Sequence, residues 1–237
     1  MQWLSRMSEF SKSAVDRAGG ALRAWWLSEN DDLPESSATI LFEFRGQFPN
    51  PTKKVTVGLR QFVIRESPPG AQPTVGQRLK RAPQIVRKLA RHPKMNLSRM
   101  QDVGGCRAIL ENHEQVRRVA ERIERNWNVK HRKHYTREEP AESGYRALHI
   151  VVERDSRLIE IQLRTPNQHG WAEVIERTDR RTGLDMKSGE GPSDLIEYFR
   201  IAADGLAAED AGERPSPGLL RDFNRARSRI LHYLERS

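Results

Sequence analysis

The chain of 237 residues carries 41 Lys and Arg against 32 Asp and Glu, a formal net charge of +9, and 36% of its residues are hydrophobic. This composition predicts one or two soluble domains with a normal core, and it excludes disordered, collagen-like and coiled-coil chains. No apolar run approaches the roughly eighteen residues that span a bilayer, so we expect a cytoplasmic protein with no membrane partner. The single cysteine, Cys106, excludes an intramolecular disulfide and a cysteine-based zinc site.

The first 36 residues are predicted to form a helical appendage, because a helix-friendly stretch containing Trp25 and Trp26 breaks at residues 30–34. Between Ser37 and Glu66, apolar residues recur around two prolines, which favours two short helices, although strands also fit the pattern. Residues 68–76 are rich in proline and glycine and are expected to form a loop.

The positive charge is concentrated in one segment. From Ser67 to Gln101 there is no Asp or Glu, whereas this segment contains the cations Arg78, Lys80, Arg81, Arg87, Lys88, Arg91, Lys94 and Arg99. Part of it is predicted to lie on a short helix that begins near Pro83 and ends before Pro93. A second basic stretch, residues 130–137, is expected to be a loop. Together the two stretches indicate a polyanionic ligand, the alternative being a solvated face.

The centre of the chain is predicted to form a sheet. Cys106–Leu110 is typical of a strand in which Cys106 is a core residue, and apolar spacing predicts a helix over 113–126. Two further strands, 147–152 and 158–164, are separated by a short polar link and should form an antiparallel hairpin. The second of these alternates apolar and polar residues, which leaves one polar face for a ligand.

Three helices are predicted after the hairpin, from Gln168, from Pro192 and from Ser216, the last with an arginine stripe at Arg221, Arg225 and Arg229. The order of elements implies an α+β fold with a small mixed β-sheet flanked by helices. We expect this domain to span 37–208, with the N-terminal appendage before it and a basic C-terminal helix over 209–237.

Two carboxylates are candidates for a metal site, since Asp102 stands just before a strand and Glu160 lies within one. Such a pair can hold one Mg²⁺ together with substrate phosphates. Beside a basic region, this arrangement suggests phosphoryl or pyrophosphoryl transfer. The alternatives are a turn or cap role for Asp102 and, for Glu160, an ion pair with Arg164 or an exposed strand position.

No Gly-rich phosphate loop with Lys and Ser/Thr occurs, so side chains must hold ATP if it binds, and Arg78, Lys80 and Lys88 are the natural donors. Tyr145 stands at a loop-to-strand junction, where its ring can stack on a nucleobase or pack in the core. His149 is a single imidazole, a type that is more often structural than catalytic.

Four stretches of the chain resemble, in order, the motifs of the nucleotide pyrophosphokinase domain of the RelA/SpoT type. The resemblance is to its single-domain members, the small alarmone synthetases and their toxic relatives. The stretches are Arg78–Lys80 with Ile85 and Lys88, Gln101–Arg107, Ser143–His149, and Ile159–Thr165 followed by His169, Trp171, Ala172 and Glu173. The resemblance covers residues from about 37 to 208 and implies a nucleotidyltransferase-like synthetase domain.

This resemblance implies transfer of the β,γ-pyrophosphate of ATP to a ribose 3′-hydroxyl, with Mg²⁺ as cofactor. It assigns Asp102 and Glu160 as catalytic metal ligands, and Glu160 would share the metal or activate the hydroxyl. The further positions it implies are the ATP-binding residues Arg78, Lys80, Lys88 and Arg107 and the acceptor-binding residues Tyr145, Gln162, Arg164 and His149. The hydrolase motif and the ribosome-binding region of long members are not found, so a synthetase alone is expected.

One position departs from the pattern. Ala141 stands where guanosine-using members commonly carry Lys, and Glu138, Glu139 and Glu142 add negative charge nearby. Two acceptors therefore stay open: GDP or GTP, which would give (p)ppGpp-type alarmones, and the 3′-CCA end of tRNA, which would make a translation-blocking toxin. The toxin hypothesis implies an antitoxin partner or a role in phage defence. The resemblance separately implies a homo-oligomer, since single-domain relatives often form one. A domain that only binds nucleotides or RNA is the third hypothesis.

Overall fold

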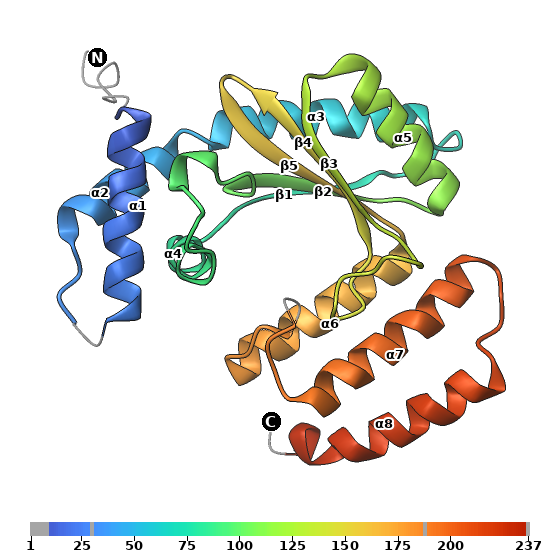
Figure 1. Cartoon of the computed structure of the whole chain (residues 1–237). Coiled ribbons are helices and arrows are strands. Elements are labelled where there is room, and N and C mark those ends of the chain that lie inside the picture. Colours follow the sequence, from blue (N-terminus) through green and yellow to red (C-terminus); the bar gives the residue numbers. More distant parts are fainter. Residues whose placement is uncertain (1–9, 29–30, 187–188, 236–237) are drawn as a thin grey trace.

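The computed structural model describes residues 10–28, 31–186 and 189–235 and has a five-stranded mixed sheet at its centre (Figure 1). The strand order is β1-β2-β5-β4-β3; β2 and β5 are parallel, and the other neighbours are antiparallel. The strands are β1 (Thr74–Leu79), β2 (Gly104–Ile109), β3 (Val129–Tyr135), β4 (Ala147–Arg154) and β5 (Arg157–Arg164). The expected α+β fold with a small mixed sheet is therefore confirmed.

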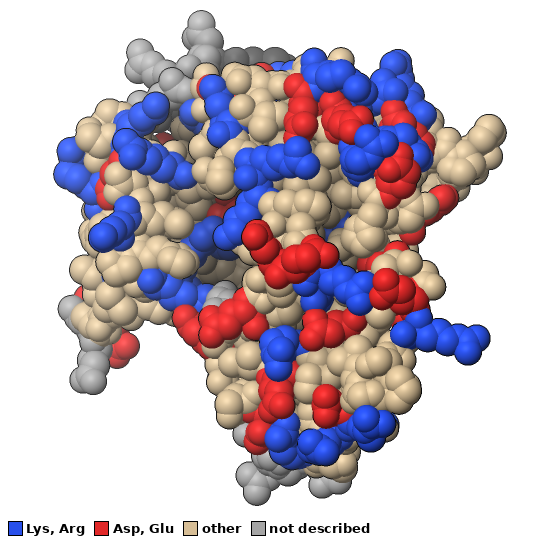
Figure 2. Space-filling view, turned by 45° about the vertical axis from the view of Figure 1, so that its right-hand side comes forward, with Lys and Arg blue, Asp and Glu red and all other residues tan. Residues whose placement is uncertain are grey.

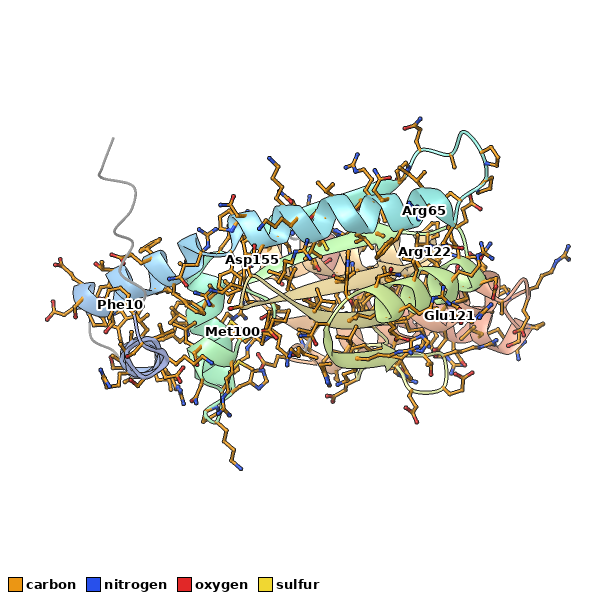
Figure 3. The ribbon with its side chains drawn as sticks, turned by 90° about the horizontal axis from the view of Figure 1, so that it is seen from above. Phe10, Arg65, Met100, Glu121, Arg122 and Asp155 are labelled. Carbon is orange, nitrogen blue, oxygen red and sulfur yellow. The ribbon has the colours of Figure 1, made fainter. Side chains whose placement is uncertain are left out.

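Helices cover one face of this sheet and flank the other (Figure 1). Helix α3 (Pro49–Arg65) and helix α5 (His113–Asn126) lie on the first face. Seen from that side, the Arg65 end of α3 lies beside Arg122 of α5, and the Asp155 turn lies toward the other end of α3 (Figure 3). The predicted alternation of β5 is confirmed, because Ile159, Ile161 and Leu163 are fully buried in the core that α3 and α5 cover. The polar residues of β5 therefore lie on the opposite face.

The N-terminal segment adds two further helices, α1 (Lys12–Leu27) and α2 (Glu35–Gly46). The two short helices predicted between residues 37 and 66 are thus confirmed as α2 and α3. Helix α1 packs against α2, α4 (Ala82–Arg91) and the short 3₁₀ helix η2 (Leu97–Arg99). Its buried residues Val15 and Leu22 belong to the same hydrophobic cluster as the sheet.

The C-terminal half forms a second hydrophobic cluster from α6 (Pro166–Thr182), α7 (Ser193–Asp210) and α8 (Pro217–Glu235). The indole N–H of Trp171 in α6 donates to the carbonyl of Phe199 in α7 at 2.8 Å. One arginine of the predicted stripe on α8 is engaged within the protein, because Arg229 forms ion pairs with Glu197 and Asp194 of α7. No helix in the described part of the chain is long and apolar enough to cross a bilayer.

Both edge strands differ from the sequence-based prediction. Strand β1 begins within the loop expected over 68–76, and β3 occupies the basic stretch expected to be a loop. Each strand pairs on one side only, and Val75 is the single buried residue of β1, while β3 has none. A strand with so little burial leaves almost no hydrophobic period in the sequence.

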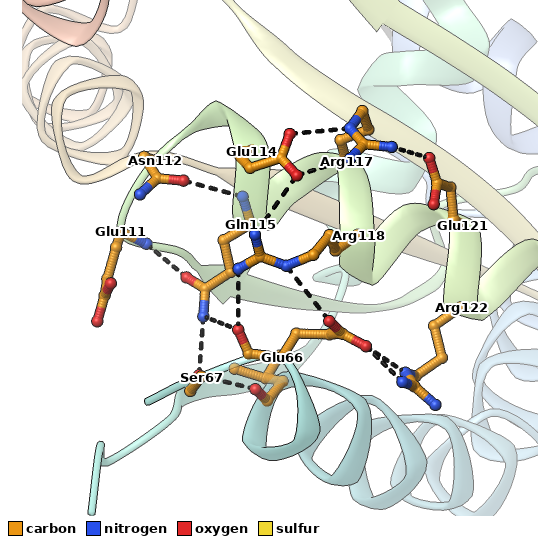
Figure 4. Close-up of polar contacts among 11 residues, drawn as sticks. Glu66, Ser67, Glu111, Asn112, Glu114, Gln115, Arg117, Arg118, Glu121 and Arg122 are labelled. Carbon is orange, nitrogen blue, oxygen red and sulfur yellow. Dashed lines mark hydrogen bonds and ion pairs between the residues drawn. The ribbon is translucent and has the colours of Figure 1, made fainter. Parts of the chain in front are cut away.

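A polar contact joins the end of α3 to the start of α5 (Figure 4). The Gln115 side chain is 3% exposed; its oxygen accepts from the Glu111 N–H at 2.7 Å, and its nitrogen donates to the Ser67 hydroxyl at 2.8 Å. Glu66 accepts from Arg122 at 2.7 Å beside it. Since buried polar groups stabilise only when they are paired, this contact fixes α5 relative to α3.

Replacing Gln115 by Ala is expected to lower the free energy of unfolding by about 1–3 kcal/mol, because it removes the buried amide that pairs with the Glu111 N–H and the Ser67 hydroxyl. Urea denaturation measures the change. Gln61→Ala on the exposed side of α3 is the matched control and should stay within about 0.5 kcal/mol of the parent. Equal losses in the two variants would contradict the assignment.

Candidate active site

Asp102 is held between two lysines at one end of the sheet. Its Oδ2 atom accepts from Lys80 Nζ at 2.9 Å and from Lys88 Nζ at 2.8 Å. The Asp102 side chain is 11% exposed and that of Lys80 14% exposed. Three separate segments meet here, because Lys80 follows β1, Lys88 lies on α4, and Asp102 precedes β2.

The local structure explains this meeting. The Lys80 N–H donates to the Val103 carbonyl at 2.8 Å, which continues the β1–β2 pairing up to the Asp102 turn. Ile85 and Leu89 anchor α4 in the core, and Lys88 sits on the turn between them. Pro83 in the first turn of α4 fits its expected helix start.

The charges of this cluster depend on one another. Burial raises the pKa of Asp102, but the positive charges of Lys88 and Lys80 lower it by more, so that the pKa is about 2. Burial likewise lowers the pKa of Lys80, which Asp102 partly restores. The second carboxylate oxygen, Oδ1, is buried and has no hydrogen-bond partner among the described residues. The cluster therefore presents an ionised carboxylate with one oxygen available to a ligand.

Glu160 lies on β5 and is held by two routes that both start at Arg164. In the first, Arg164 donates to the Tyr145 hydroxyl at 2.8 Å, which contacts His149 Nε2 at 2.7 Å, and His149 Nδ1 contacts Glu160 at 3.1 Å. In the second, Arg164 donates to Gln162 at 2.6 Å, and Gln162 donates to Glu160 at 2.7 Å. Because a carboxylate only accepts, His149 carries a proton on Nδ1, and both oxygens of Glu160 are oriented.

This ring of five side chains keeps Glu160 ionised. Burial raises the pKa of Glu160, but the hydrogen bond and charge of His149 lower it, and the hydrogen bond of Gln162 lowers it further, so that it is about 2. The charge of Asp102 acts in the opposite direction and raises the pKa of Glu160. The two carboxylates are therefore close enough to repel each other, an interaction that a bound cation would relieve.

A small pocket lies against Glu160 and Gln162, and its lining does not include Asp102 or the two lysines. Its volume is about 50 Å³, and it is lined by Gly76, Gln77, Arg78, Gly105, Cys106, Arg107, Glu160 and Gln162. In the sheet register, Arg78, Gly105 and Glu160 are directly opposite one another. Because Gly105 has no side chain, no side chain of β2 separates Arg78 of β1 from Glu160 of β5 at this level of the sheet. Lys and Arg alternate with Asp and Glu over the molecular face in Figure 2, and Lys and Arg predominate at its upper left.

Of the two alternatives that the sequence left open for Tyr145, the structure shows the ring packed in the core. It is 3% exposed, packs edge-on to Tyr135 at 5.5 Å and lies 5.2 Å from the Arg164 guanidinium. Burial raises its pKa to about 12. A stacked nucleobase would require Tyr145 to turn out of this cluster, so its acceptor role stays a prediction.

The structure places the ten predicted site residues in three connected sets. Arg78, Arg107, Glu160 and Gln162 line the pocket, Tyr145, His149 and Arg164 join the ring that holds Glu160, and Lys80, Lys88 and Asp102 form the lysine–aspartate cluster. Arg107 lines the pocket and contacts Nδ1 of His169, a residue of the stretch that follows the fourth motif, at 3.4 Å. Gly105 was not among the predicted site residues, because a glycine carries no functional group and no local pattern marks its place between Arg78 and Glu160. Cys106 is a core residue, as predicted, and burial raises its pKa to about 12.

The residues fit a hard divalent cation bound through few protein ligands. In the described part of the chain no group of three or more His, Cys, Asp and Glu side chains could hold a metal by itself. Mg²⁺ needs only one or two carboxylates when substrate phosphates and water complete its octahedron. The unpartnered Oδ1 of Asp102 and the repulsion between Asp102 and Glu160 suit such an ion.

Residues 77–179 match the family model of a region found in RelA / SpoT proteins. The chain thus carries a RelA/SpoT domain, which confirms the resemblance read from the motifs. An uncharacterized protein of Mycobacterium tuberculosis is 32% identical over 123 residues, which are 51% of this chain and 45% of that relative. The chain therefore matches less than half the length of this curated relative.

Solved structures with the same fold include two synthetase-type proteins. A GTP pyrophosphokinase family protein from Streptococcus pneumoniae superposes with a TM-score of 0.59 at 23% identity, over 72% of this chain and 89% of that one. The small alarmone synthetase 1 of Bacillus subtilis, bound to its product pppGpp, gives 0.57 at 24% identity, over 68% and 88%. The same synthetase is known bound to AMPCPP. These likenesses confirm the fold.

The low pKa of Glu160 predicts how stability changes with pH in metal-free buffer. Because its folded-state pKa of about 2 lies below the ordinary value of 4.5, the ionised group stabilises the fold fully above about pH 4.5. This contribution, of roughly 3 kcal/mol, is lost as the pH falls toward 2. The Glu160→Gln variant should therefore lose less stability than the parent between pH 6 and pH 3, as measured by urea denaturation with EDTA present.

The control for this measurement is Glu153→Gln on β4, whose side chain is 36% exposed. It should reproduce the pH slope of the parent. A Glu160→Gln slope as steep as that of the parent would show that Glu160 has an ordinary pKa.

Proposed function

We propose that this RelA/SpoT domain is an ATP-dependent pyrophosphokinase, and that its acceptor is the ribose 3′-hydroxyl of GDP or GTP. The observation that carries the proposal is the pair of ionised carboxylates. Asp102, with one free oxygen, lies beside Glu160 of the neighbouring strand, and cations surround both. In the proposed reaction the 3′-oxygen bonds to the β-phosphorus of ATP, the bond from that phosphorus to the α–β bridging oxygen breaks, and AMP leaves.

Lys80, Lys88 and Arg78 are the proposed ATP phosphate ligands. Lys80 and Lys88 already converge on one carboxylate oxygen, so both ammonium groups point to the same place. Arg78 stands opposite Gly105 at the pocket, and Arg107 extends the cationic wall. Such fixed positive charges stabilise the charge that develops on the transferred group.

Asp102 and Glu160 would hold Mg²⁺, which when bound neutralises phosphate charge and orients the transferred group. The sequence left open whether Glu160 shares the metal or activates the acceptor hydroxyl. Its pKa of about 2 makes it a weak base at neutral pH. Its fixed orientation instead suits a metal ligand, and phosphoryl transfer relies mostly on positioning and electrostatics.

A second acceptor, the 3′ end of tRNA, is favoured by the loop that precedes Tyr145. Ala141 supplies no cation there, while Glu138, Glu139 and Glu142 are exposed. Negative groups at this position disfavour the free 5′-phosphates of GDP or GTP. We therefore keep a tRNA-directed toxin as the alternative, together with its expected antitoxin partner.

The purified chain, with Mg²⁺ and ATP labelled on the γ-phosphate, is expected to transfer label to GDP or GTP. Separate reactions offer GDP, GTP and deacylated tRNA. Asp102→Asn and Glu160→Gln should each lower the rate by at least about 100-fold, since each removes a charge at the reacting group. The Glu153→Gln variant should keep the rate of the parent. Label on tRNA alone would favour the alternative acceptor, and label on none would contradict the pyrophosphokinase.

The acceptor loop gives an independent test of the acceptor. If guanosine nucleotides bind beside residue 141, Ala141→Lys should raise kcat/KM for GDP roughly tenfold, because a charge-assisted contact to phosphate is gained. Ala141→Gln, of similar length but uncharged, should leave this value nearly unchanged. A lysine variant that transfers no faster than the glutamine variant would remove Ala141 from the acceptor site.

A further inference from the structure

Helices α1 and α2 lie outside the segment that matches RelA / SpoT proteins, yet they contact all three segments that meet at Asp102. These segments are the end of β1, helix α4 and the connection from α4 to β2. The connection, residues 92–103, contains no regular element except η2. Apart from the Val103 carbonyl at its end, which accepts from the Lys80 N–H at 2.8 Å, its backbone bonds are short-range turns, such as Met95 N–H to His92 at 2.8 Å and Met100 N–H to Leu97 at 3.1 Å.

Helix α1 supplies tertiary hydrogen bonds to this connection. Asp16 accepts from the Ser98 N–H at 2.8 Å and from the Ser98 hydroxyl at 3.0 Å. Arg23, two turns further along α1, donates to the carbonyls of Pro93 and Met95. A carboxylate and a guanidinium on one helix thus hold both ends of the segment 93–98.

Close packing reinforces these bonds. A side-chain carbon at Gly19 would stand 2.7 Å from Leu97 Cβ and 3.4 Å from Leu89 Cδ1, whereas one at Gly20 would meet nothing within 4 Å. Leu97 and Leu89 are both fully buried. Helix α1 therefore lies closest to η2 and α4 at Gly19, where a side chain would not fit, whereas the neighbouring Gly20 faces open space.

Helix α2 holds the third segment. Arg45 Nε donates to the Lys80 carbonyl at 2.8 Å, while the Lys80 ammonium contacts Asp102 at 2.9 Å. Each of the groups Lys80, Lys88 and Asp102 thus lies on a segment that α1 or α2 fixes from behind.

We propose that α1 and α2 form a brace that sets the geometry of the ATP-phosphate site, with Asp16, Arg23 and Arg45 as positioning residues that do not touch the substrate. The proposal rests on the proposed function for the identity of the ligand. Its physical basis is that the connection 92–103 has few long-range backbone bonds of its own. Loss of the α1 contacts would let Lys88 and Asp102 move apart and weaken the phosphate site.

The two adjacent glycines of α1 provide the sharpest test. Gly19→Ala and Gly20→Ala raise helix propensity alike, but only the first forces α1 away from Leu97. Gly19→Ala should weaken binding of AMPCPP, measured by calorimetry with Mg²⁺, roughly tenfold. Gly20→Ala should bind as the parent does. In the transfer reaction, the KM for ATP should rise in Gly19→Ala while the KM for the acceptor stays within about twofold.

Asp16→Ala tests the hydrogen bonds, with the exposed Arg17→Gln on the same helix as control. Asp16→Ala should weaken AMPCPP binding and speed amide hydrogen exchange over residues 93–102, with β4 and β5 unchanged. If Gly19→Ala and Asp16→Ala both showed the same hydrogen-exchange rates and the same AMPCPP affinity as the parent, the brace would be overturned. A parent that transfers no label refutes the proposed reaction only; hydrogen exchange still decides the brace.

Discussion

The parallel pairing of β2 with β5 determines where every charged group of the site stands. Because the two strands run in the same direction, the turn that holds Asp102 before β2 lies at the end of the sheet where β5 begins. The register sets Gly105 opposite Glu160, and the two carboxylates come within electrostatic reach. An antiparallel neighbour would place the Asp102 turn at the far end of β5. The cations from β1, α4 and β5 are then arranged around this one negative pair.

The two carboxylates are compensated in different ways. Asp102 is neutralised by lysines from two other segments, and these segments depend on helix packing for their positions. Glu160 accepts hydrogen bonds from His149 of β4 and Gln162 of β5, and the backbones of these strands are fixed by their pairing. The Asp102 side therefore combines cations from two separately packed segments with a carboxylate that has an unpartnered oxygen among the described residues, while Glu160 is oriented by the sheet itself. Phosphate oxygens can replace Asp102 as partners of the lysines without disturbing the sheet.

The sequence predicted the elements that bury many apolar residues. Helix α5 and strand β5 were predicted within a residue of their bounds, because Val116, Val119 and Ile123, and Ile159 and Ile161, repeat at clear periods. The edge strands β1 and β3 were missed because they bury almost nothing. The motifs predicted which residues form the candidate site, but not the hydrogen-bonded ring in which Tyr145 is buried. That ring depends on side-chain packing between β4, β5 and α6, which no local pattern encodes.

The acid-free run from Ser67 to Gln101 serves two purposes at once. Lys80 and Lys88 are paired with Asp102, and Arg91 with Asp185 and Glu190 of the segment after α6, so part of the excess charge is internal. A different set, Arg78, Arg81, Lys94 and Arg99, is exposed. A merely solvated face would have its cations at the surface and its acids elsewhere. Here Lys80 and Lys88 converge on the buried Asp102, which keeps one carboxylate oxygen without a partner among the described residues. That convergence favours a phosphate ligand over a solvated face as the reason for the run.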